Sequence, residues 1–260
     1  MAATPAPVVI VGIGELGGVF ARGLLRLGHP IVPVTREQRI ADSLAANPEA
    51  ELVLVTVGEK ELDAVLAEIP EPFRDRVGLV QNELLPQTWQ ARDVRAPTVY
   101  VVWFEKKPGR DVHVVQPSVA FGRSAELLVR ALAELGIPAR AASGDQGELL
   151  LELVNKNLYI LTTNLAGLVT GGTVSDLWQK HQPLAREVAS EVLDLQERLA
   201  HQELERHVLL ERLEQAIAAD PEHPCTGRSA EERLARALRH ADREGLAVPR
   251  LRAIAASRRG

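Results

Sequence analysis

Three glycines near the start of the chain have the spacing of a dinucleotide-binding turn, Gly-x-Gly-x-x-Gly, and follow an apolar run at 7–11. In such a turn the first glycine permits a tight bend, the second lets a pyrophosphate approach the backbone, and the third lets helix and strand pack closely. Unpaired N–H groups and the positive end of the following helix then receive phosphate oxygens. We predict that this turn binds a dinucleotide, although a tight turn without a ligand has the same spacing. Its residues are Gly12, Ile13, Gly14, Glu15, Leu16 and Gly17.

The residue after the second predicted strand (31–35) bears on which dinucleotide binds. Folds that prefer NAD usually place Asp or Glu there, on the ribose 2′-OH, whereas this chain has Arg36. A guanidinium can form bidentate hydrogen bonds to a 2′-phosphate. We therefore predict NADP as the cofactor, with Arg36 at its 2′-phosphate. The alternative is that Arg36 is the first solvated residue of the next helix. Glu15 is an unfavourable charge for either cofactor.

One lysine and two asparagines are the candidates for catalysis. Lys156 and Asn164 lie in a predicted helix (148–169), roughly opposite its apolar stripe when residues are placed at about 100° steps. That side, which also carries Thr163, could line a cleft or could lie in water, as lysine usually does. Asn82 follows a short predicted strand, so it lies at the carboxyl edge of the sheet, where ligands bind. An equally good interpretation is that its side chain caps the turn that follows. The apolar stripe consists of Leu150, Val154, Leu158, Leu161 and Leu165.

The elements that must position these residues follow from hydrophobic periodicity. Strand and helix patterns alternate up to residue 80, which indicates an α/β fold with a doubly wound parallel sheet of the Rossmann type. The segments 98–104, 111–115 and 118–122 have strand patterns, so we expect an antiparallel part added to that sheet. A small polar run at 142–147 marks the predicted boundary. The expected domains are therefore a dinucleotide-binding domain at 1–144 and an all-helical domain at 145–260.

The second domain is predicted to contain further helices. The pattern at 184–218 indicates one long amphipathic helix, which would either wrap the domain or form the contact of a homodimer. Ser229 precedes another predicted helix, with Glu231 and Glu232 in a capping arrangement by spacing. A last helix is expected to begin near Pro249.

Composition narrows the class of protein. A chain of 260 residues with 46% apolar and 25% charged residues can bury a core, and a net charge of −5 indicates no nucleic-acid partner. No apolar run approaches the ~20 residues of a membrane span, and the start lacks the pattern of a secretory signal. We therefore expect a cytoplasmic protein. Cys225 is the single cysteine. Together with His223 it could begin a metal site, but no further ligands follow at a suitable spacing, so we predict no metal.

These motifs resemble those of the ketopantoate reductase family. The family has a lysine followed at four-residue steps by two asparagines, and here the positions hold Lys156, Ile160 and Asn164. Its Gln/His-Asn-Gly after strand four corresponds to the Gln-Asn-Glu at 81–83. The segment 245–249, Gly-Leu-Ala-Val-Pro, is similar to the one that leads into the family's last helix.

The resemblance implies a Rossmann domain, a helical C-terminal domain and an active site between them. There NADPH would reduce a 2-oxo acid or a similar small carbonyl compound. Lys156 would be the general acid that protonates the developing alkoxide. Asn82 and Asn164 would hold the lysine, the nicotinamide ribose or the substrate oxygen by hydrogen bonds.

Two further departures from the family pattern leave a second function open. The lysine expected just after strand three is replaced by Val57-Gly58, with Lys60 two residues along, and Ser229 stands where the substrate-binding glutamate would be. A homologue that binds NADP without catalysis, as a sensor or scaffold, is therefore the alternative. A hydroxyacid or imine-type dehydrogenase on a related scaffold is the third possibility, because fold alone does not fix the substrate.

Overall fold

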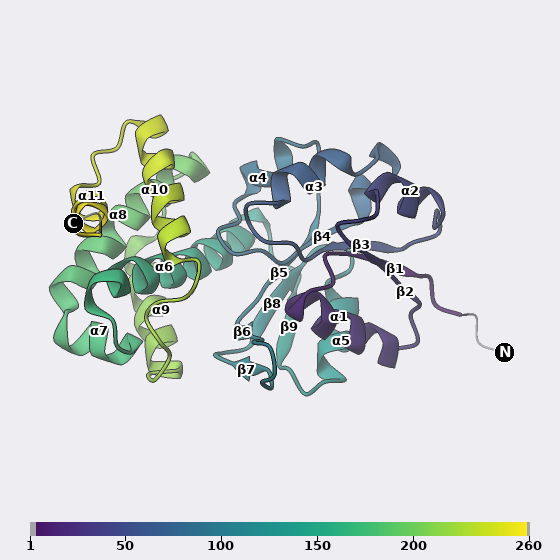
Figure 1. Cartoon of the computed structure of the whole chain (residues 1–260), viewed down its shortest axis with the longest axis horizontal. Coiled ribbons are helices and arrows are strands. Elements are labelled where there is room, and N and C mark those ends of the chain that lie inside the picture. The colour runs from purple at the N-terminus through teal and green to yellow at the C-terminus, as the bar shows by residue number, and fades with distance from the viewer. Residues whose placement is uncertain (1–3, 259–260) are drawn as a thin grey trace. The chain divides into compact units, whose positions relative to one another are not determined.

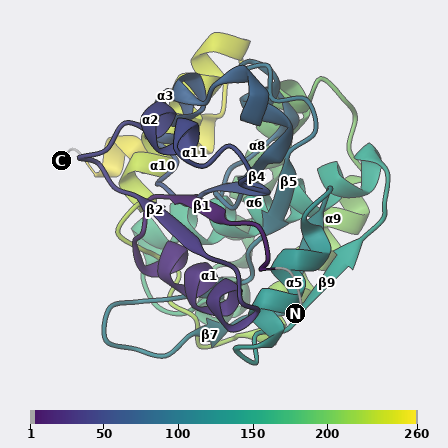
Figure 2. The ribbon, with the colours of Figure 1, turned by 90° about the vertical axis from the view of Figure 1, so that its right-hand side faces the viewer.

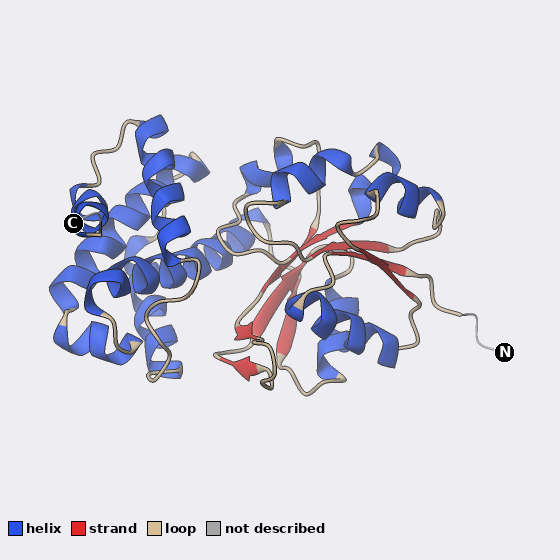
Figure 3. Cartoon of the chain, in the orientation of Figure 1, coloured by secondary structure: helices blue, strands red, loops and turns tan. Residues whose placement is uncertain are grey.

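The computed structural model of the chain describes residues 4–258. It divides into two compact units, 1–152 and 153–260, and the helix α6 (Gln146–Thr170) runs through the boundary. Figure 1 labels the elements, and Figure 3 shows that the strands belong to the first unit while the second is helical. Among the described helices, none combines the length and apolar character that crossing a membrane requires.

The first unit is built on a sheet of seven strands within the described residues, in the order β2-β1-β3-β4-β5-β8-β9. The strands from β2 to β5 are parallel, β8 pairs antiparallel with β5, and β9 runs parallel to β8. The strands are β1 (Val8–Val11), β2 (Ile31–Val34), β3 (Leu52–Val55), β4 (Val77–Leu79), β5 (Thr98–Val101), β8 (Ser118–Phe121) and β9 (Ala139–Ala142). The predicted α/β fold with an added antiparallel part is confirmed.

Helices cover both faces of this sheet. One layer contains α1 and α5, and the other contains α2, α3 and α4, as Figures 1 and 2 show. The helices are α1 (Glu15–Arg26), α2 (Ile40–Ala45), α3 (Leu62–Glu68), the 3₁₀ helix η1 (Glu71–Arg76), α4 (Pro86–Gln90) and α5 (Ala125–Ala133). The glycine turn therefore lies where β1 ends and α1 begins, as predicted.

The prediction of a single strand at 98–104 is wrong. The chain leaves the large sheet after β5 and forms a separate antiparallel pair, β6 (Phe104–Glu105) with β7 (His113–Val114). At the departure point the Trp103 N–H donates to the Ser118 hydroxyl at 2.9 Å, and its carbonyl accepts the Val115 N–H at 2.9 Å. These hydrogen bonds replace the sheet ladder, so the β-branched pattern of the segment alone could not reveal the break.

Close packing fixes α1 against its neighbours. A Cβ at Gly23 would lie 2.1 Å from the Ala131 carbonyl oxygen of α5, so only glycine allows the two helices to approach this closely. The rings of Phe20 and Tyr100 form a T-shaped pair, with centroids 5.2 Å apart. The helix whose N-terminus carries the glycine turn is thus held on the sheet and on α5.

The second unit is a set of helices around α6. They are α7 (Val174–Lys180), α8 (Gln182–Ala200), α9 (Arg206–Ala219), α10 (Ala230–Glu244) and α11 (Pro249–Ser257). The apolar stripe predicted on α6 is buried. Thr163, which lies on the opposite side of the helix, is buried as well. Asn157 of α6 donates to the Gln196 oxygen of α8 at 2.9 Å, which pairs two buried amides.

The single helix predicted at 184–218 is wrong, because the chain breaks between α8 and α9. His201 ends α8 in the left-handed conformation, with φ 50°. Arg206 then folds back so that its guanidinium donates to Asp194 at 2.7 Å and to Glu197. The hydrogen bond from Arg206 holds the pKa of the Glu197 carboxyl below its usual value. A periodic apolar pattern continues across this break, so periodicity alone merged the two helices.

His201 gives a stability test of this helix end. A left-handed residue with a side chain costs roughly 1–2 kcal/mol, and glycine removes that cost at the price of some backbone entropy. We expect His201→Gly to raise the free energy of unfolding by about 1 kcal/mol. Urea titration of the variant beside His201→Ala, which keeps the Cβ, measures the difference. No gain over the alanine variant would contradict the argument that the left-handed conformation of residue 201 is costly for a residue with a Cβ.

The start of α10 departs from its predicted cap. Ser229 occupies the N-cap position, but its side chain makes no capping hydrogen bond, so the capping arrangement is not formed. Glu231 instead pairs with Arg258 at 2.8 Å. The last helix begins at Pro249, as predicted.

Candidate functional site

The glycine turn has the geometry that a phosphate cradle requires. Gly12 has φ 91°, and a Cβ there would lie 2.8 Å from a Val57 methyl. A Cβ on Gly17 would lie 2.3 Å from the Gly12 carbonyl oxygen, so the third glycine allows the helix to meet the turn. Gly14 differs, because a Cβ there meets nothing within 4 Å. The space beside Gly14 is therefore open, as the approach of a ligand to the backbone requires.

Backbone donors at the start of α1 face the same turn. Within the described residues, the Gly18 N–H donates to the Gly14 carbonyl at 2.8 Å. The backbone N–H groups of residues 14–17 donate to no backbone carbonyl there. These amides remain available, together with the positive end of the helix. The Thr56 hydroxyl, just beyond β3, donates to the Gly12 carbonyl and fixes the turn from the other side.

A cleft of about 910 Å³ opens from the glycine turn across the carboxyl ends of β2 and β3. Its volume lies in the range of pockets that hold small molecules and cofactors. The turn contributes Gly12, Ile13 and Gly14 to the lining, and the end of β2 contributes Thr35 and Arg36. Helix α3 and the two residues before it, Lys60 and Glu61, line the cleft as well. The glycine motif and Arg36 therefore line one cavity. From the sequence alone, this was only an expectation.

Arg36 stands at the edge of this cleft in a turn. Helix α2 begins only at Ile40, so the alternative that Arg36 opens the next helix is wrong. The turn is held by Gln38, whose side-chain oxygen accepts the Thr35 N–H at 2.9 Å. The Arg36 side chain is 89% exposed, and its guanidinium pairs with Glu61 of the α3 N-cap at 2.8 Å.

Glu15 is charge-compensated, which the sequence did not indicate. The Lys106 ammonium, from the segment after β6, lies 3.1 Å from the Glu15 carboxylate. The Lys106 side chain is 14% exposed, so the chain holds this cation against the start of α1. The carboxylate in the glycine turn is therefore balanced within the first unit.

Asn82 lies just beyond β4 and donates to the Glu59 carboxylate at 3.2 Å. Its neighbour Gln81 donates to the Val55 carbonyl at 2.8 Å and so ties the ends of β3 and β4 together. Glu83, where the family pattern has glycine, has φ 61°. The backbone at this position thus has the left-handed conformation that glycine favours.

In the second unit, Lys156 and Asn164 lie on α6 and both are partly buried. The Lys156 ammonium lies 5.9 Å from the centre of the Tyr159 ring. Asn164 is engaged on both sides: its Nδ2 donates to the Cys225 carbonyl at 3.1 Å, and its Oδ1 accepts from Arg233 at 2.7 Å. Asn164 therefore joins α6 to the loop before α10 and to α10 itself.

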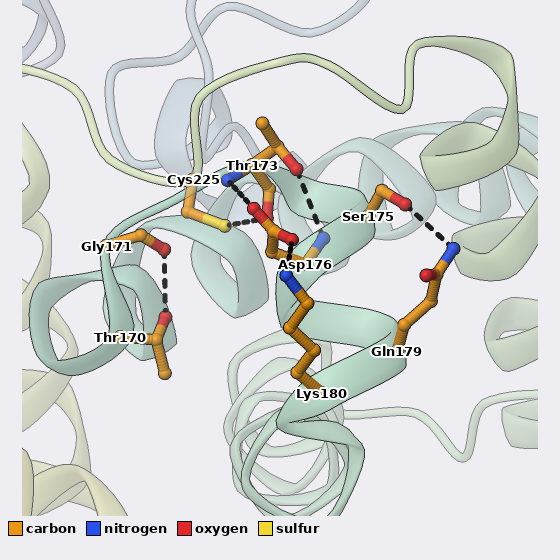
Figure 4. A network of polar contacts seen from close by, with 8 residues as sticks. All are labelled: Thr170, Gly171, Thr173, Ser175, Asp176, Gln179, Lys180 and Cys225. Carbon is orange, nitrogen blue, oxygen red and sulfur yellow. Dashed lines mark hydrogen bonds and ion pairs between the residues drawn. The ribbon is translucent and has the colours of Figure 1, made fainter.

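Cys225 has a structural role in that loop. Its thiol donates to the Thr173 carbonyl at 2.8 Å, and Thr173 caps α7 together with Asp176, as Figure 4 shows. Burial, with a smaller effect from the Asp176 charge, raises the pKa of the Cys225 thiol to about 11. A Cβ on Gly167 would lie 2.5 Å from that of Cys225, so the loop packs directly on α6. The thiol is neutral near pH 7, which disfavours a nucleophile or metal ligand.

Sequence reasoning missed three residues of the first unit that complete the candidate site. Thr56 fixes the glycine turn, Glu61 holds Arg36, and Lys106 balances Glu15. Each meets its partner across a long sequence separation, so no local spacing identifies the pair. For Thr56, the local signal that could have identified it is its place directly after the buried strand β3, at the carboxyl end of the sheet.

Sequence comparison and structure comparison differ in what they find. No protein-family model and no curated protein matches the sequence. Solved structures do match over nearly the whole chain. A ketopantoate reductase of the PanE/ApbA family from Ralstonia eutropha JMP134 is 18% identical, with 97% of each chain covered and a TM-score of 0.67.

Two other solved structures are similar to a comparable degree. A probable 2-dehydropantoate 2-reductase from Bacillus subtilis is 16% identical, with 96% of this chain and 98% of that chain covered and a TM-score of 0.65. A ternary structure of D-mandelate dehydrogenase with NADH and anilino(oxo)acetate is 13% identical, with 95% and 96% covered and a TM-score of 0.65. The resemblance predicted from the motifs is thus confirmed for the fold: this chain has the two-domain fold of the ketopantoate reductases.

Proposed function

We propose that the chain is a cytoplasmic, NADPH-dependent oxidoreductase that reduces a 2-oxo acid or a similar small carbonyl compound. The observation that carries the proposal is the glycine turn, open at Gly14, that leads into a cleft with Arg36 at its edge. The fold likeness to 2-dehydropantoate 2-reductases and to a D-mandelate dehydrogenase solved with NADH supports the reaction class. A homodimer is part of the proposal, since a similar ketopantoate reductase from Staphylococcus aureus is described as dimeric.

The residues of the first unit fit a dinucleotide. The amides at the start of α1 would bind the pyrophosphate, and the open space at Gly14 would let it approach. Arg36 would bind the 2′-phosphate, and Asn82 would hold the nicotinamide ribose. A bound nicotinamide supplies the hydride that reduces the carbonyl carbon.

The residues of the second unit would serve the substrate. Lys156 would protonate the alkoxide oxygen that develops as the carbonyl is reduced, which is the task of a general acid. Asn164 would act beside Lys156, by orienting the lysine or the substrate oxygen. Since fold alone does not fix the substrate, the 2-oxo acid itself must be found by assay.

A specific observation favours the second candidate function, a NADP-binding sensor or scaffold. Both ends of the Asn164 amide already bond to protein groups, Cys225 and Arg233, which gives this residue a structural role that needs no substrate. Ile160, where the family has asparagine, is buried and apolar. Calorimetry with NADPH, together with a turnover assay on a panel of 2-oxo acids, separates the two functions. Binding with turnover supports the enzyme, and binding without turnover on any of them supports the sensor.

Arg36→Ala tests the proposed cofactor preference. A charge-assisted hydrogen bond to the 2′-phosphate contributes about 1.5–3 kcal/mol, which corresponds to roughly ten- to hundredfold in affinity. We expect the variant to raise the NADPH dissociation constant by that factor and to leave the NADH constant nearly unchanged, as measured by calorimetry. The matched control is Arg39→Ala, an exposed arginine nearby that does not line the cleft. Equal loss of both cofactors, or a wild type that prefers NADH, would contradict the assignment.

A further inference from the structure

Glu61 has a fixed position in the cleft. One carboxylate oxygen accepts from the Arg36 guanidinium at 2.8 Å, and the other accepts the Gly58 N–H at 3.3 Å. Both hydrogen bonds hold the side chain between the turn after β3 and the residue proposed to bind the 2′-phosphate. The Glu61 side chain is 35% exposed, against 89% for Arg36, so the carboxylate is the better anchored partner.

The charges around this pair do not form a simple anion site. The charged residues of the cleft lining are Arg36, Glu37, Lys60, Glu61 and Glu68. The lining therefore contains two cations and three carboxylates, and within the described residues the carboxylate bonded to Arg36 is that of Glu61. A 2′-phosphate, with close to two negative charges at neutral pH, must replace Glu61 at the guanidinium or share it. A ribose hydroxyl, in contrast, can donate a hydrogen bond to a carboxylate.

Resting on the proposed function, we infer that Glu61 is a specificity-determining residue that limits the preference for NADPH. In this role it competes with the 2′-phosphate for Arg36 and accepts a hydrogen bond from the unphosphorylated ribose of NADH. The cleft then binds both cofactors, and the preference depends on the balance of Arg36 and Glu61. The acidic residue that would favour NAD lies at the N-cap of α3 and not at the end of β2, where sequence motifs place it.

The test is Glu61→Gln, which removes the charge and keeps the shape and the acceptor for Gly58. The exposed Arg36–Glu61 ion pair and the repulsion between Glu61 and the 2′-phosphate each contribute only a small free energy. We therefore expect the NADPH dissociation constant to fall about three- to tenfold. The NADH constant should rise or stay the same, so the ratio of the two constants changes. A purely structural role of Glu61 would move both constants together. Thermal unfolding of the variant checks that the fold is retained.

Two further variants make the result specific. Glu68→Gln makes the same charge change within the lining, at an exposed residue that has no ion pair with Arg36 in the described part of the chain. We expect it to alter the ratio of the two constants by less than twofold, since distant exposed charges are screened. When Arg36 is also replaced by alanine, Glu61→Gln should raise NADPH affinity by a smaller factor. The reason is that the guanidinium for which Glu61 and the 2′-phosphate compete is then absent.

The outcomes separate the inference from the function on which it rests. If the wild type binds neither dinucleotide, both are overturned. If the wild type binds NADPH but Glu61→Gln shifts both cofactors equally, or Glu68→Gln shifts the ratio as much, only the role of Glu61 is overturned. A changed ratio that depends on Arg36 supports it.

Discussion

Replacing Lys156 with alanine should lower the turnover of the carbonyl substrate by about 10²–10⁴-fold, the usual contribution of a general acid. The NADPH dissociation constant should stay near the wild-type value, because the proposed cofactor contacts lie in the first unit. The expected pattern is therefore a loss in kcat with little change in cofactor binding. Steady-state NADPH consumption and calorimetry on the same preparation measure both quantities.

The control for Lys156 is Lys180→Ala, which removes an exposed lysine that pairs with Asp176 on α7. That variant should keep wild-type turnover. Because Lys156 is partly buried and lies over Tyr159, thermal unfolding must show that the alanine variant stays folded. Equal rates for wild type and Lys156→Ala, in a folded variant, would remove the lysine from the mechanism.

Gly14→Ala should separate nucleotide binding from stability. The added methyl meets no protein atom within 4 Å, so the free energy of unfolding should change little. The same methyl would occupy the space through which a pyrophosphate approaches the backbone, and such overpacking costs about 1–3 kcal/mol. We expect NADPH and NADH affinity to fall together by roughly five- to 150-fold, as measured by calorimetry.

Gly18→Ala is the matched control for this change. Its methyl also meets nothing within 4 Å, but Gly18 lies in the first turn of α1, beyond the cleft lining. Alanine is the better helix former by about 1 kcal/mol, so stability should stay the same or rise. Cofactor affinity should not change. If Gly14→Ala binds NADPH as well as Gly18→Ala does, the open space at Gly14 is not the pyrophosphate site.

The parts of the fold that the sequence predicts are those that local pattern determines. The Gly-x-Gly-x-x-Gly turn and the buried strands β1 and β3 depend on residues close together in the chain, and they lie where expected. The break at Trp103 and the end of α8 at His201 depend on partners from other segments, Ser118 and Arg206. Hydrophobic periodicity does not contain that information, so both segments were predicted as continuous.

The candidate site shows the same division. Arg36 could be assigned to the end of β2 from spacing, because the position after a strand is a local property. Its pairing with Glu61, and that of Glu15 with Lys106, joins side chains that only the folded sheet brings together. The charge balance around Arg36 and around the glycine turn, on which the proposed cofactor preference and affinity depend, could not be predicted without those contacts.

The most direct test of the proposed reaction is to follow the hydride. NADPH that carries deuterium in the transferred position at nicotinamide C4 is incubated with the chain and the panel of 2-oxo acids, and the products are analysed by mass spectrometry. The proposed function predicts a 2-hydroxy acid with one deuterium on the former carbonyl carbon, formed by wild type and greatly reduced with Lys156→Ala. A hydroxy acid without deuterium, or no product from any acid of the panel, would contradict it.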